Sequence, residues 1–318
     1  MKRTRVCDLL GIDYPILQGG MLWLATAELA AAVSNAGGLG IISSHAGMEK
    51  HGDPVENLRL QIARIRNLTS KPFGVNILLD LQQSGALVDL ILREEVEIVV
   101  TAAGDPRLFT GVLTHEGAKV LHVVSTVRQA ESAESCGAGA VIAEGVEAGA
   151  HVGFEEIPLL SLIPQVADAV SIPVVAAGGI VDSRGLVAAF ALGAEAVQLG
   201  TRFVAAQECI AHPRYKKALL DAKDTDTMIT SRRLLPTRSV KAGFSRRLLE
   251  LDTSGASAED LRSFLGSGRA RAGQVEGDLE NGEAYCGASA GLIREILPAA
   301  KVIRELVEGY NKVVKRIT

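Results

Sequence analysis

The chain has 318 residues, of which 47% are hydrophobic, 22% charged and 4% aromatic. This composition is typical of a soluble globular enzyme and excludes disordered and fibrous classes. The formal net charge of −4 gives no general attraction to polyphosphate, so we expect no nucleic-acid partner. The length allows one large domain with an appendage or two modest domains.

Four widely spaced cysteines form no C-x-x-C pair; they are Cys7, Cys136, Cys209 and Cys286. This spacing predicts reduced thiols, with no disulfide framework and no metal site. The N-terminal residues contain no apolar segment of the kind found in signal peptides. Residues 29–48 lack Asp, Glu, Lys and Arg, but glycines and polar residues interrupt them, which favours two short elements over a membrane span. We therefore expect a cytoplasmic protein with no membrane partner.

Eight short apolar runs, rich in β-branched residues, fit buried parallel strands. They cover residues 15–18, 39–43, 73–78, 98–101, 119–124, 140–144, 173–177 and 196–200. Amphipathic stretches of helical length lie between them, for example at 26–35, 54–67, 85–94 and 183–192. Such β-α units can close into a barrel or spread as a doubly wound sheet. Nearly identical turns at 137–141 and 193–197 favour an α/β fold of the (β/α)8 TIM-barrel type.

The pattern changes after residue 210. Residues 211–270 are charged, contain leucines and carry few strand signals, which predicts a helical insertion or cap. Within it, residues 231–247 hold six basic residues and no acidic one. Such a run is most often a solvated helix face, although it could recognise a phosphate. Residues 288–317 predict a closing helix that packs on the barrel. We therefore expect a barrel over 1–210, a cap over 211–285 and a C-terminal helical segment over 286–318.

The carboxyl ends of the predicted strands are polar and rich in glycine. In a parallel barrel this end carries the functional site. Gly178, Gly179 and Gly200 follow the last two strands and precede helical runs, which suits backbone amides that hold a phosphate. The same glycines would also suit tight turns. Neither a Rossmann fingerprint nor a Walker A sequence is present.

His151 is the candidate acid–base residue. It lies in a glycine-rich loop directly after a predicted strand, near Glu144 and Glu147. An imidazole at such a place can accept or donate a proton near neutral pH. A histidine in a loop is more often simply solvated, so this alternative stays open on position alone.

Several of these segments resemble one flavoenzyme family. They are Tyr14–Met21, Ala36–Gly40, Lys71–Asn76, Glu144–His151, Ala176–Ile180 and Gln198–Phe203. The chain resembles the nitronate monooxygenase (2-nitropropane dioxygenase) family, which includes the FMN-dependent enoyl-acyl-carrier-protein reductase II. The resemblance spans nearly the whole chain and implies a (β/α)8 barrel that holds FMN at its strand ends beneath a helical cap.

The resemblance also implies roles for individual residues. Residues placed along the flavin are Gly20, Met21, Asn76, Glu144 and Gly149. Residues placed at the ribityl phosphate are Gly178, Gly179, Gln198, Gly200 and Thr201. His151 takes the position of the family's catalytic histidine. This arrangement is physically coherent because FMN supplies the redox chemistry while the protein binds and orients it.

Two reactions are compatible with the resemblance. The leading one is oxidation of a small alkyl nitronate with O2, in which His151 takes the α-proton of a neutral nitroalkane. Reduction of an enoyl thioester, carried on acyl carrier protein or CoA, is supported nearly as well. Its reductant would be NADH or NADPH. Residues 143–145 and 236–238 look like the reductase, whereas residues 149–151 and 287–292 depart from it. A flavin-binding sensor without turnover is a lesser alternative, and a homodimer stays open.

Overall fold

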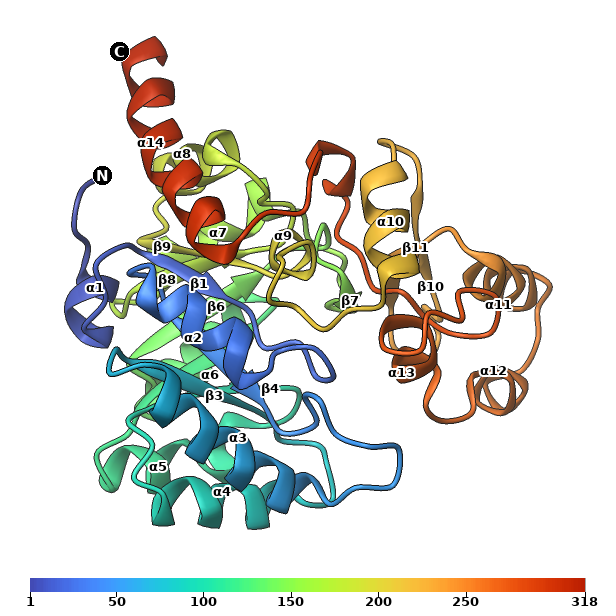
Figure 1. Cartoon of the computed structure of the whole chain (residues 1–318), viewed down its shortest axis with the longest axis horizontal. Coiled ribbons are helices and arrows are strands. Elements are labelled where there is room, and N and C mark those ends of the chain that lie inside the picture. Colours follow the sequence, from blue (N-terminus) through green and yellow to red (C-terminus); the bar gives the residue numbers. More distant parts are fainter. Residues whose placement is uncertain (318) are drawn as a thin grey trace.

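The computed structural model describes residues 1–317, and within them eight parallel strands form a barrel (Figure 1). The strands are β1 (Ile16–Gln18), β2 (Gly40–Ser43), β3 (Phe73–Leu78), β4 (Ile98–Ala102), β5 (Lys119–Val124), β6 (Ala140–Glu144), β8 (Val174–Ala177) and β9 (Ala196–Leu199). Their order in the sheet is β1-β9-β8-β6-β5-β4-β3-β2. A parallel bridge between Leu17 and Leu39 joins the two ends of the sheet. The predicted strands and the (β/α)8 fold are confirmed.

Helices alternate with the strands and cover the outside of the barrel (Figure 1). They are α2 (Ala27–Asn35), α3 (Pro54–Leu68), α4 (Ser84–Arg93), α5 (Thr110–His115), α6 (Val127–Ser135), α7 (Leu159–Ala169), α8 (Ser183–Ala191) and α9 (Thr201–Val204). A 3₁₀ turn, Pro106–Leu108, precedes α5. Local sequence explains where they begin: at α3, the Asp53 side chain accepts from the Val55 amide and Pro54 occupies the first turn.

Alternate residues of each strand point to opposite faces, so the barrel has two apolar layers. The inner layer joins residues from seven strands, among them Leu17, Ile41, Val100, Leu121, Ile142, Val175 and Ala196. The outer layer packs Val75 and Val99 against α3 and α4. Helix α1 (Arg5–Leu10) adds Val6 to the inner layer and so fills the amino-terminal end of the barrel.

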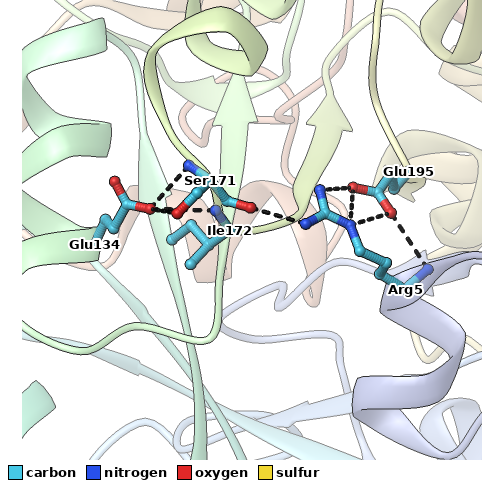
Figure 2. A network of polar contacts seen from close by, with 5 residues as sticks. All are labelled: Arg5, Glu134, Ser171, Ile172 and Glu195. Atoms are coloured by element: carbon cyan, nitrogen blue, oxygen red, sulfur yellow. Dashed lines mark hydrogen bonds and ion pairs between the residues drawn. The ribbon is translucent and has the colours of Figure 1, made fainter.

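Polar contacts fasten α1 to that amino-terminal end (Figure 2). The Arg5 guanidinium pairs with Glu195, the residue before β9, and donates to the Ser171 carbonyl oxygen at 2.8 Å. Glu134 of α6 accepts from the backbone amides of Ser171 and Ile172 at 2.8 and 3.2 Å. The network links elements far apart in sequence at the end of the barrel away from the cap.

The cap contains α10 (Pro213–Asp221), β10 (Thr227–Thr230), β11 (Thr237–Val240), α11 (Gly243–Thr253), α12 (Ala258–Leu265) and α13 (Arg269–Gln274). A short strand after the barrel strand β6, β7 (Ala150–His151), joins it, giving an antiparallel sheet in the order β10-β11-β7. The predicted helical cap therefore also contains a small sheet. The strand signals are weak because β10 and β11 have only four residues each, and β11 contains the polar residues Thr237, Arg238 and Ser239.

The basic run 231–247 is not a solvated helix face, because it includes β11 and most of its arginines have internal partners. Arg232 pairs with Glu156 at 2.5 Å, and Arg233 lies 3.4 Å from Asp252. Arg238 donates to the Val146 carbonyl oxygen at 3.0 Å. Glu156 and Val146 lie far from the run in sequence, which is why composition alone did not indicate them.

The C-terminal helix α14 (Ala299–Ile317) packs on α2 and α8 (Figure 1). It begins later than predicted, because residues 288–298 form no α-helix and contain only a 3₁₀ turn, Ala290–Leu292, that packs on α10 of the cap. Thr318, the last residue of the predicted segment, lies outside the described residues. No helix within residues 1–317 is long and apolar enough to cross a membrane.

Candidate functional site

Three predicted site residues point into the barrel at its carboxyl end. Ile142 and Ala196 belong to the inner layer, so Glu144 and Gln198, each two residues further along its strand, also point inward. Asn76 lies between two outward residues of β3 and shares this orientation. Glu144 and Gln198 are only partly buried, unlike the fully buried residues beneath them. The mouth of the barrel is therefore lined by two amides and a carboxyl group.

The segment after β1 approaches Asn76 so closely that a side chain at Gly20 would not fit. A Cβ atom on Gly20 would lie 2.5 Å from Asn76 Cβ. Asn76 Nδ2 donates to the Val100 carbonyl oxygen at 3.2 Å, which orients the amide. Met21, the next residue, is partly buried beside this contact. Gly20 and Asn76 together form one wall of the mouth.

The predicted phosphate glycines behave in two ways. Gly178 and Gly179 have φ angles of +105° and +68°, so the turn after β8 itself requires glycine. At Gly149 a Cβ atom would come within 2.7 Å of the Cys286 backbone, which also excludes a side chain. Gly200 differs, because a Cβ atom there would meet nothing within 4 Å. The space beside Gly200 is open, and Thr201 follows it, with Oγ1 accepting from the Gly287 amide at 3.0 Å.

A buried polar atom at the mouth supports a ligand there. Gln198 Oε1 is buried and has no hydrogen-bond partner within residues 1–317. Leaving such an acceptor unsatisfied costs about 1 to 3 kcal/mol, and a bound donor would remove that cost. The two amides, the carboxyl group and the open space beside Gly200 fit a flat polar ring with a phosphate, as in FMN.

Glu144 is the electrostatically unusual residue of the mouth. Burial raises the pKa of its carboxyl group to about 8, with no charged partner opposing the shift. At neutral pH the carboxyl group therefore keeps its proton and can donate a hydrogen bond. Glu147, which the sequence placed near His151, instead accepts from the Leu159 amide at 3.0 Å and caps α7.

His151 is held by the cap. Its Nδ1 lies 2.9 Å from Thr237 Oγ1, and that hydroxyl group donates its own hydrogen to the Leu235 carbonyl oxygen at 2.8 Å. With the hydroxyl hydrogen directed to Leu235, Thr237 Oγ1 accepts from His151, an arrangement that fits a neutral imidazole with its proton on Nδ1 and a lone pair on Nε2. Desolvation lowers the pKa of His151, while the Asp80 carboxylate opposes this shift. The side chain of His151 is nevertheless exposed at the surface of the chain.

Sequence reasoning missed two neighbours of His151. Thr237 was noted only as part of a reductase-like segment, and its role depends on a contact across 86 positions. Tyr285 packs against His151 with ring centroids 5.7 Å apart. No local signal marks either residue, because both reach His151 through β11.

Comparison with known proteins identifies the relatives of the chain. It matches the family model described as nitronate monooxygenase over residues 3–86 and 82–309. A probable nitronate monooxygenase of Staphylococcus saprophyticus is 32% identical and covers 98% of this chain and 99% of its own length. An octahydro-indene-carboxyl-CoA dehydrogenase of Mycobacterium tuberculosis is 38% identical over 72% of this chain. The match spans only 63% of that relative's length.

A solved structure has the same fold over the whole chain. FabK from Thermotoga maritima is 44% identical, covers 100% of this chain and 99% of its own, and superposes with a TM-score of 0.93. The likeness includes the cap as well as the barrel.

Proposed function

Because the chain belongs to the nitronate monooxygenase family, we propose that it is an FMN-dependent oxidoreductase that reduces an enoyl thioester with NADH or NADPH. One observation carries the choice of substrate: FabK, an enoyl-acyl-carrier-protein reductase II, is 44% identical over the full chain. The probable nitronate monooxygenase is 32% identical over a similar share. This comparison reverses the order in which the sequence alone ranked the two reactions.

The residues at the barrel mouth would hold FMN. Asn76, Glu144 and Gln198 would face the flavin ring, with the Glu144 carboxyl group as a hydrogen-bond donor. Gly179, Gly200 and Thr201 would surround the phosphate. When bound, FMN supplies two-electron redox chemistry between a reduced nicotinamide and the substrate.

His151 would move the proton that accompanies this chemistry. In the protonated imidazole, Nδ1–H would remain hydrogen-bonded to Thr237. Nε2–H would be available to protonate the α-carbon or the carbonyl oxygen of an enoyl thioester. The contact with Thr237 thus keeps the ring in one orientation in both protonation states. The pairing of β7 with β11 would hold this group against the cap.

Oxidation of a nitronate or nitroalkane is the second candidate, and the state of His151 favours it. Its lowered pKa and fixed Nδ1–H leave a lone pair on Nε2 at neutral pH. That is the form a base needs to take the α-proton of a neutral nitroalkane. The substrate would then be a small molecule and the oxidant O2.

Anaerobic flavin absorbance separates the candidates. Purified protein, supplied with FMN, is mixed separately with NADH, NADPH and propyl nitronate while the flavin band is followed. Bleaching by a pyridine nucleotide, followed by recovery with crotonyl-CoA, is the expected result. Bleaching by the nitronate alone would favour the second candidate, and failure to bind FMN would contradict both.

A further inference from the structure

Strand β11 pairs with two segments that are far apart in sequence. His151 pairs with Thr237, and Tyr285 forms an antiparallel bridge with Ser239. Residues two apart on a strand share a face, and directly opposed residues of antiparallel strands share it too. The His151 and Tyr285 side chains therefore stand on one face. Their rings are 5.7 Å apart between centroids and are inclined by 57°.

Tyr285 is fixed in turn by a buried carboxyl group. Its hydroxyl group donates to Glu283 Oε2 at 3.0 Å, and Glu283 is only 7% exposed. Arg269, whose charge acts on Glu283, directs its guanidinium to backbone carbonyl oxygens of Phe264, Leu265 and Asn281. Glu283 thus has no ion pair within residues 1–317. Burying a carboxyl group is costly, so its hydrogen bond to Tyr285 points to a role beyond packing.

A core-filling role alone does not account for Tyr285. Tyr215, which is 1% exposed, is the fully buried tyrosine here, and its hydroxyl group donates to the Tyr285 carbonyl oxygen. Tyr285 is instead only partly buried, and its ring packs against His151. With Thr237 on one ring nitrogen and Tyr285 against the ring, the imidazole is restrained from two directions.

We propose that Tyr285 and Glu283 are positioning residues for His151. The Tyr285 ring keeps the imidazole against Thr237, and Glu283 keeps the Tyr285 ring in place. The inference rests on the proposed function only in that His151 is the acid–base residue of the same site.

Histidine NMR tests the positioning without any substrate. The 15N spectrum of labelled protein is followed against pH, and the His151 signals are assigned by their loss in His151→Gln. We expect the wild type to hold the Nδ1–H form. Tyr285→Leu should mix the two tautomers and raise the His151 pKa toward its ordinary value, because water reaches the ring. The charged group facing His151, Asp80 in the loop after β3, is unchanged in this variant.

Matched variants separate the contribution of the Tyr285 ring from that of the Glu283 carboxyl group. Tyr285→Phe keeps the ring and should preserve the tautomer better than Tyr285→Leu. Glu283→Gln keeps an acceptor and should restore the behaviour that Glu283→Leu loses. Tyr310→Leu is the control, because Tyr310 makes a similar ring contact, 5.9 Å to Phe190, away from the site.

Kinetics supply the second readout. Misplacing an acid–base group by about 1 Å can lower turnover by up to about 100-fold, so kcat of Tyr285→Leu should fall with little change in KM. If the tautomer and pKa of His151 in this variant match those of Tyr310→Leu, the inference is wrong. If they change while none of the tested substrates is turned over even by the wild type, the positioning stands and the proposed function fails. Should Tyr285→Leu not fold, the two Glu283 variants decide the question in the same way.

Discussion

His151 Nδ1 lies 2.9 Å from Thr237 Oγ1, which also lies 2.8 Å from the Leu235 carbonyl oxygen, an arrangement in which the imidazole donates to the hydroxyl oxygen. One hydroxyl group thereby selects the tautomer of the candidate acid–base residue. A hydrogen bond to one ring nitrogen sets which ring nitrogen can exchange a proton with substrate.

Thr237→Val should remove the preference of His151 for the Nδ1–H tautomer. The valine side chain keeps the shape of threonine but offers no acceptor to Nδ1, so we expect mixed His151 tautomers and a fall in kcat of about tenfold or more. Thr230→Val is the matched control, because Thr230 is equally buried in the adjacent strand β10. Equal kcat losses in the two variants would show that the effect is structural.

The pH dependence of turnover should report the role of His151. Burial lowers its pKa below the ordinary value of 6.5. If His151 donates a proton to an enoyl thioester, kcat should fall as pH rises through this lowered pKa. If it takes a proton from a nitroalkane, kcat should rise over the same interval. His151→Ala should retain FMN, lower turnover by about 100-fold or more and abolish this limb of the profile. If the same change of kcat with pH persists in His151→Ala, another group transfers the proton.

Gly20→Ala should weaken FMN binding. The new methyl group would lie 2.5 Å from Asn76 Cβ, so either the loop after β1 or the Asn76 amide must move. We expect the dissociation constant for FMN, measured by flavin fluorescence, to rise by about tenfold or more, equivalent to about 1.4 kcal/mol. Gly85→Ala is the control, because a Cβ atom there meets nothing within 4 Å and alanine favours the helix α4. An unchanged dissociation constant for FMN in Gly20→Ala would show that Gly20 and Asn76 do not form part of the flavin site.

Glu144→Gln should stabilise the flavin-free protein at alkaline pH. The pKa of Glu144 is about 8 in the folded chain against an ordinary 4.5, so the folded state retains a proton that the unfolded state has lost between these values. Stability therefore decreases as pH rises from about 4.5 to 8, and glutamine removes that loss. Thermal unfolding of both proteins across this range checks the sign. A difference in melting temperature that does not grow with pH would contradict the raised pKa.

The sequence was informative where a residue's neighbours are dictated by the strand pattern. Runs such as residues 119–124 predict buried strands, and the alternation within a strand then places Asn76, Glu144 and Gln198 at one end of the barrel. It was less informative in the cap. There β11 finds its partner β7 far away in the chain, so neither the small sheet nor the contact of Thr237 with His151 has a local signature.

The assignment of individual glycines shows the same division. Gly178 and Gly179 are required by positive φ angles, so the turn interpretation holds for them whether or not a phosphate binds. Gly200 has open space beside it, which only the folded chain reveals. The roles of these residues in FMN binding remain predictions that the flavin measurements above will test.

The pairing of β7 with β11 has an evolutionary consequence. His151, the candidate acid–base residue, forms its hydrogen bond with Thr237 of the cap, whereas the predicted flavin contacts come mainly from barrel strands and the turns that follow them. Under the proposed function, substitutions in residues 211–285 would alter proton transfer without changing the predicted flavin contacts of the barrel. A new reaction would then require changes in one insertion and not in the barrel.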